Sequence, residues 1–147
     1  MAISVFNPDE IEVGPIGPMM AGLVKNEEVK AFLASKGEED GNLSAVVVSD
    51  SENMGVGVGT WKKGQHTNKP VPLMFDEVLV IVSGTITITI DGESKTARQG
   101  EIVHLHAKQM VMFGSEEGCR LVWITCPPTW KAIERAWEQG LIPKPAK

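Results

Sequence analysis

The chain has 147 residues, 42% of them hydrophobic and 22% charged, with a formal net charge of −5 at neutral pH. This length fits one domain with its own core, and an acidic balance with scattered lysines argues against a nucleic-acid partner. No stretch reaches the roughly 18 apolar residues of a membrane span, and no basic signal segment opens the chain, so we expect a cytoplasmic protein that binds small molecules.

Residues 1–42 are expected to form an N-terminal arm and a short helix that pack on the rest of the domain. The first 25 residues carry three prolines among short apolar runs, which favours an extended arm over a helix. Residues 26–37 begin with asparagine and two glutamates and end in glycine. That order of cap, acids and terminator predicts a helix.

Residues 43–127 are expected to form an all-β barrel, because short apolar or alternating runs recur at intervals of about ten residues between turn signals. The predicted strands are 43–48, 54–61, 78–82, 85–90, 94–98, 102–105, 110–113 and 119–125. Asp91-Gly92 predicts a type I′ hairpin turn. Glycine at every second position from 55 to 59 indicates that another backbone or a ligand approaches one strand face closely.

The end of the chain, residues 128–147, is expected to form a helix and a tail. Thr129 can cap a helix over residues 130–139, in which two tryptophans and an isoleucine recur at helical spacing. We expect this helix to pack on its own barrel.

The two cysteines are expected to be buried, reduced and unpaired. Cys119 and Cys126 lie seven residues apart on one predicted strand, so they point to opposite faces and lie roughly 20 Å apart. A disulfide needs Cα atoms within about 7 Å.

The histidines carry the main chemical signal, because all three lie in two short segments. His66 precedes Glu77, and His104 and His106 follow Gly100-Glu101. Imidazole and carboxylate groups bind zinc, iron, manganese or nickel, and they also transfer protons. His104 and His106 share one face of their predicted strand.

Glu77 leads a predicted barrel strand, where an unpaired charge in apolar surroundings is costly. A metal, a histidinium or a bound proton would satisfy it, and the last two would give the carboxyl the raised or coupled pKa of a general acid or base. Other catalytic motifs are missing from the sequence: no phosphate-binding loop of the GxxxxGK[ST] type, no Gly-x-Ser-x-Gly elbow and no Cys-x-x-Cys.

Three motifs give the chain a family resemblance. Residues 74–84 resemble the first cupin motif, in which glutamate precedes glycine by seven positions; residues 91–92 and 100–103 resemble the turn and the second motif; and residues 126–130 resemble a proline-tryptophan exit. The chain is thus similar to the cupins, and among them to the small, single-domain ethanolamine-utilisation type. The resemblance implies a jelly-roll barrel flanked by a short N-terminal helix and a C-terminal helix, and commonly a homodimer.

The chain departs from the usual cupin metal motifs. His66 is followed two positions later by Asn68 instead of a second histidine, and Val111 stands where the fourth ligand usually lies. A divalent ion (Fe, Zn, Mn or Ni) would therefore need a rearranged set, for which we predict His66, Glu77, His104 and His106.

Two functional hypotheses follow. The first is an enzyme that acts on a small organic metabolite by metal-assisted or acid-base chemistry, as a lyase, isomerase or oxygenase, with Glu77, His104 and His106 as catalytic residues. Its predicted substrate-binding residues are Trp61, Met74, Met112 and Trp123. The alternative is a metal-free cupin that binds a metabolite, or that serves as an assembly partner in a pathway such as ethanolamine utilisation.

Overall fold

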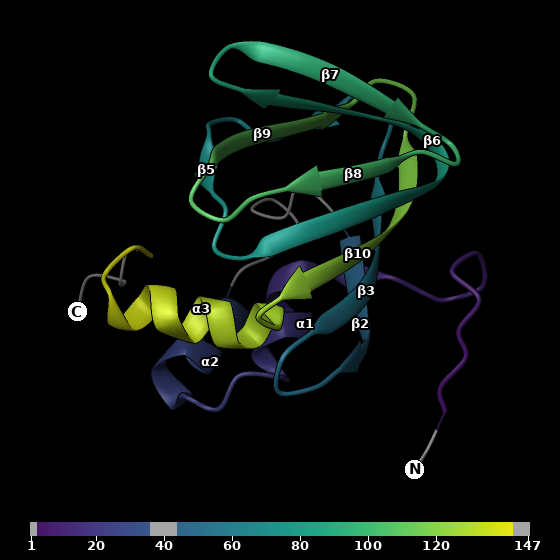
Figure 1. Ribbon diagram of the computed structural model, residues 1–147. Helices are drawn as coiled ribbons and strands as arrows, with labels where there is room; N and C mark the ends of the chain where they lie inside the picture. Colours follow the sequence, from purple (N-terminus) through teal and green to yellow (C-terminus); the bar gives the residue numbers. More distant parts are fainter. Residues whose placement is uncertain (1–2, 36–43, 143–147) are drawn as a thin grey trace.

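The computed structural model describes residues 3–35 and 44–142, which form a curled antiparallel sheet with three short helices at one end (Figure 1). The helices are α1 (Ile16–Ala21), α2 (Glu27–Ala34) and α3 (Thr129–Glu138). The strands are β1 (Gly14–Pro15), β2 (Ser44–Asp50), β3 (Gly55–Trp61), β4 (Gln65–His66), β5 (Val71–Pro72), β6 (Asp76–Ile90), β7 (Glu93–Arg98), β8 (Ile102–Leu105), β9 (Met110–Ser115) and β10 (Cys119–Cys126). The predicted mostly β architecture with helices at both ends of the chain is confirmed.

Strand β6 joins the two halves of the barrel. Its first part pairs with β10 and β8, and its second part pairs with β7 and β9. The predicted break at Ser83-Gly84 is a bend within one continuous strand, where Gly84 has φ +72°. A Cβ atom at Gly84 would lie 1.9 Å from the Gly118 carbonyl oxygen, so only glycine fits this bend.

The hairpin between β6 and β7 confirms the predicted turn. Asp91 and Gly92 have φ values of 53° and 78°, as a type I′ turn requires. Hydroxyl groups pair across the two strands, Thr87 with Thr96 at 2.8 Å and Thr89 with Ser94 at 2.6 Å. These cross-strand pairs fix the register of the hairpin.

The N-terminal segment differs from the prediction, because residues 16–21 form α1 instead of continuing an extended arm. Pro18 is the third residue of this helix, and the first four N–H groups of a helix have no partner within it. A proline there removes no hydrogen bond, so it does not prevent the helix. Residues 3–13 do form an arm, and the Arg120 guanidinium donates to the carbonyl oxygens of Pro8 and Ile11.

The other two helices begin close to their predicted positions. The Asn26 side chain accepts hydrogen bonds from the N–H groups of Glu28 and Val29, as a helix cap does. Helix α2 ends at Ala34 with Ser35 as its cap, before the predicted end at Gly37, which itself lies outside the described residues, as does the predicted loop at 38–42. Thr129 is the first residue of α3 and not its cap, and its hydroxyl pairs with that of Thr125 at 3.2 Å.

Helix α3 packs within its own chain, mainly against α1 and α2, and lies beside α2 in Figure 1. The rings of Phe32 and Trp137 lie 5.2 Å apart, and the Glu134 carboxylate accepts hydrogen bonds from the N–H groups of Lys25 and Asn26. These contacts form a small second core, which closes one end of the barrel.

The cysteine prediction is confirmed in part. Cys119 and Cys126 are both free, and Cys119 is buried, which raises its pKa to about 11. Cys126 is exposed, contrary to the prediction, because it lies on the opposite face at the end of β10. None of the helices in the described part of the chain is long and apolar enough to cross a membrane.

Candidate functional site

Glu77 lies inside the barrel. It is the second residue of β6, and it is paired with Leu105 on β8 and Thr125 on β10. Its side chain points inward with those of Leu79 and Ile81, because every second residue of a strand shares a face. Only 9% of Glu77 is exposed, and burial raises the pKa of its carboxyl from 4.5 to about 8. The predicted inward glutamate with a raised pKa is present.

The Glu77 carboxyl opens on a cavity of about 240 Å³, which we call the Glu77 cavity. Its wall is almost entirely apolar. The lining residues are Ile16, Trp61, Val71, Pro72, Leu73, Met74, Phe75, Glu77, Leu79, Phe113, Leu121, Trp123 and Thr129. Three of the four predicted substrate-binding residues, Trp61, Met74 and Trp123, are therefore brought together around Glu77.

Sequence reasoning missed two aromatic residues of this wall, Phe75 and Phe113. Phe113 contacts Trp61, with ring centroids 6.0 Å apart, and Phe75 precedes β6 directly. Phe113 falls on a predicted strand, so its alternation could have placed it inward. Phe75 carries no such signal, since it lies between β5 and β6.

Of the described residues that line the Glu77 cavity, Glu77 alone is ionisable. Within the described residues its carboxyl makes no hydrogen bond or ion pair. The other polar residue of the wall is Thr129, whose hydroxyl is already paired with Thr125. The chemistry of this cavity therefore depends on one carboxyl group surrounded by aromatic and aliphatic side chains.

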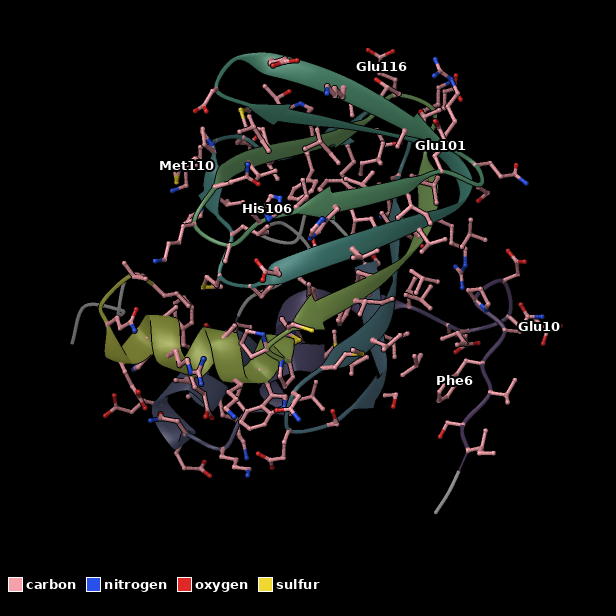
Figure 2. All side chains as sticks on the ribbon, viewed as in Figure 1. Phe6, Glu10, Glu101, His106, Met110 and Glu116 are labelled. Carbon is pink, nitrogen blue, oxygen red and sulfur yellow. The ribbon has the colours of Figure 1, made fainter. Side chains whose placement is uncertain are left out.

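His104 and His106 lie on the opposite face of the sheet from Glu77. Glu77 pairs with Leu105, and both point inward. The next pair along the two strands is Val78 with His104, which therefore lies on the outward face. Both histidines are exposed, with ring centroids 4.5 Å apart, and they line a different cavity of about 550 Å³ between β7 and β8. Figure 2 shows His106 at the end of β8.

His66 lies in a third place. It is exposed on β4, which pairs with β9, and it lines a cavity of about 300 Å³ that also contains Met112. Its Nδ1 lies 3.1 Å from the Thr67 carbonyl oxygen. The predicted substrate-binding set is therefore corrected at Met112, which faces away from the Glu77 cavity and is not among the residues that line it.

The predicted metal set is also corrected. The side chains of His66, Glu77, His104 and His106 lie at three separate places, and residues 3–35 and 44–142 contain no group of three or more His, Cys, Asp or Glu side chains that could hold an ion. The same separation keeps His104 and His106 from acting with Glu77 as one catalytic set. A divalent ion stays a prediction that this geometry does not support.

Comparisons with known proteins agree with this fold. The model of a family described as ethanolamine utilisation protein EutQ matches residues 15–132. The chain is 27% identical over 99 residues to acetate kinase EutQ of Clostridioides difficile, covering 63% of this chain and 61% of that protein. It is 21% identical over 133 residues to acetate kinase EutQ of Salmonella typhimurium, covering 84% of this chain and 57% of that protein. The chain thus spans about three fifths of the length of these relatives.

Solved structures show the same fold. The Clostridium difficile EutQ protein aligns with a TM-score of 0.54 at 21% identity, over 69% of this chain and 86% of that chain. An RmlC-like cupin from Shewanella frigidimarina aligns with a TM-score of 0.61 at 12% identity, over 88% of this chain and 96% of that chain. These likenesses confirm the predicted cupin fold and say nothing more about activity.

Proposed function

The chain belongs to the EutQ family of ethanolamine utilisation proteins, and we propose that it serves this process by binding a small metabolite in the Glu77 cavity. The family match supports the proposal, because every residue that lines the cavity lies within residues 15–132. Small-molecule sites are typically apolar hollows with few polar groups that orient the ligand. The Glu77 cavity has this character.

The observation that carries the proposal is the unpaired Glu77 carboxyl. Burial of a carboxyl group disfavours its charged form. The Glu77 carboxyl has no hydrogen-bond or ion-pair partner among the described residues, and its oxygens are reached only from the cavity side. A ligand that fills the cavity and pairs with the carboxyl removes this cost. The proposal therefore favours the metabolite-binding alternative over the metal-assisted enzyme.

A second candidate function is acetate kinase activity, because three curated relatives carry the name acetate kinase EutQ. That name describes a transferase, whereas the sequence led us to expect a lyase, isomerase or oxygenase. The reaction moves a phosphoryl group from ATP to an acetate oxygen and yields ADP and acetyl phosphate. No GxxxxGK[ST] loop occurs in this chain, so the phosphates would have to be held by other groups.

We expect metabolite binding to raise the melting temperature of the purified chain, and to do so through Glu77. Thermal unfolding with a panel of small amines, alcohols, carboxylic acids and aldehydes measures this effect. The matched control is the double variant His104→Ala/His106→Ala, which lies outside the Glu77 cavity and should keep the wild-type response. Glu77→Gln should lose at least tenfold in affinity.

Two results would contradict the binding proposal. One is a panel without a single hit, and the other is a hit that Glu77→Gln binds as well as the wild type does. Conversion of ATP and acetate to acetyl phosphate, measured on the same samples, tests the second candidate. A rate no higher than that of a buffer blank would remove it.

We also propose that the chain forms a homodimer through the edge of the sheet at β8. Within the described part of the chain β8 pairs only with β6, and Ile102 is 70% exposed on it. Met110, 49% exposed at the start of β9, lies on the opposite side of the view from Glu101, the residue before Ile102 (Figure 2). Unpaired apolar edges of this kind are usually covered. Light scattering should report twice the chain mass, and Ile102→Lys should return a monomer; a monomeric wild type at micromolar concentration would remove the dimer.

A further inference from the structure

Four aromatic residues line the Glu77 cavity together with Glu77. Trp61, Phe75, Phe113 and Trp123 reach the cavity from β3, the segment before β6, β9 and β10. The face of an aromatic ring carries negative charge density, so a cation placed over it is attracted, and tryptophan attracts most strongly. Rings that enclose a small space favour a positively charged group within it.

The charge distribution points the same way. The groups that face Glu77 from the neighbouring elements are Leu105 on β8, Thr125 on β10, Thr129 on α3, Ile16 on α1 and the apolar residues 71–75. Among the residues that the structure describes, no lysine, arginine or histidine lines the cavity. Asp76 is exposed and accepts a hydrogen bond from the Ala107 N–H. An anion would therefore find no cationic partner, whereas an ammonium group would meet the Glu77 carboxylate.

We propose that the ligand of the Glu77 cavity is a small organic cation, an ammonium group on a short carbon chain. This inference rests on the proposed function, since it names the class of metabolite that the cavity takes. The ammonium group lies against the Glu77 carboxylate and the rings of Trp61 and Trp123. The carbon chain contacts the aliphatic wall.

Binding of such a cation is coupled to a proton. Burial raises the pKa of Glu77 to about 8, so the carboxyl of the unliganded chain is mostly neutral at pH 7. The cation stabilises the charged carboxylate, and Glu77 therefore releases its proton when the ligand binds. The affinity should increase about tenfold for each pH unit between 6 and 8 and then level off.

Isothermal titration calorimetry of the full chain tests the proposal with four probes. Ethanolamine and choline are cations throughout pH 6 to 8, 3,3-dimethylbutan-1-ol is the uncharged counterpart of choline, and acetate is an anion. We expect at least one cation to bind at least tenfold more tightly than the neutral alcohol and acetate. In Glu77→Gln this preference should vanish, while His104→Ala/His106→Ala should keep it.

A second readout does not depend on any variant. Titration of the wild type at pH 7 in buffers of different ionisation enthalpy should show close to one proton released per cation bound. If the alcohol or acetate binds as tightly as the cations or more tightly, and if Glu77→Gln loses that binding, the inference of a cationic ligand is wrong. The proposal that the cavity binds a metabolite through Glu77 would still stand. Binding of a cation without proton release or pH dependence would also overturn the inference. If no probe and no member of the wider panel binds, both proposals fail.

Discussion

Replacing Glu77 by glutamine should remove a loss of stability that the wild-type chain suffers as the pH rises. The pKa of Glu77 is 4.5 in a solvated reference state and about 8 in the folded chain. Between these values the folded chain holds a proton that the unfolded chain has released. The free energy of unfolding therefore falls by about 1.4 kcal/mol for each pH unit in this window.

The full effect is large for a single side chain. Below pH 4.5 Glu77 is protonated in both states, and its titration does not reduce the free energy of unfolding. As the pH rises from 4.5 to about 8, the free energy of unfolding falls by up to about 5 kcal/mol. Glutamine has nearly the same shape and does not ionise. We therefore expect the variant to be the more stable of the two at pH 8, and the difference to shrink steadily towards pH 5.

Urea unfolding at pH 5, 6, 7 and 8 measures this difference. Other groups also titrate across this range, so the quantity that matters is the wild type minus Glu77→Gln. Glu93→Gln is a matched control, because Glu93 is exposed on β7 and its variant should follow the wild-type curve. A difference between wild type and Glu77→Gln that stays constant from pH 5 to 8 would show that Glu77 is solvated or paired.

The destabilising effect of Glu77 supports a role for its carboxyl in ligand binding. An apolar residue at position 77 would pack more favourably in this wall, so the glutamate reduces the stability of the empty chain above about pH 5. Such a cost typically occurs where a residue serves a ligand instead of the fold. A bound cation would return the lost stability by pairing with the carboxylate.

The strands and turns could be predicted because local pattern determines them. The alternation in β3 and the Asp91-Gly92 turn depend on neighbours in sequence, and both were found. The two-residue strands β4 and β5 were not predicted, because they form only through pairing with the distant β9. Helix α1 was missed for a related reason: its stability comes from packing against α2 and α3.

The candidate site was predicted only in part, because spacing alone does not say which face of a strand points inward. His104 and His106 share a face, as expected, but the pairing of Val78 with His104 sets that face outward. Leu105, buried between them, was the available signal, since the apolar residue of an alternating strand takes the core side. Glu77 was placed correctly because it alternates with Leu79 and Ile81.

The glycines of β3 were predicted to mark a close approach by a backbone or a ligand. At Gly55 the backbone of Pro128 and Thr129 does come close, at 3.4 and 3.5 Å from an added Cβ, whereas at Gly57 the approaching group is a side chain. Gly57 pairs with Trp123 on β10. A Cβ atom at Gly57 would lie 2.0 Å from Trp123 Cζ2, far inside van der Waals contact. The missing side chain therefore makes room for the indole that forms part of the cavity wall.

This contact predicts strong coupling between Gly57 and Trp123. Trp123→Ala should lower the free energy of unfolding by about 3–5 kcal/mol, because only 6% of Trp123 is exposed. Gly57→Ala should cost about 1–3 kcal/mol by crowding the ring. In the double variant the ring is gone, so the alanine at 57 no longer clashes and has the better strand conformation of the two residues.

A double-mutant cycle measured by urea unfolding gives the coupling free energy. We expect the double variant to be at least about 1 kcal/mol more stable than the sum of the single changes predicts. Gly14→Ala is the control, because nothing lies within 4 Å of the added Cβ and its effect should add to that of Trp123→Ala. Additive effects of Gly57→Ala and Trp123→Ala would mean that the indole does not occupy the space over Gly57, and the wall of the Glu77 cavity would then have to be redrawn.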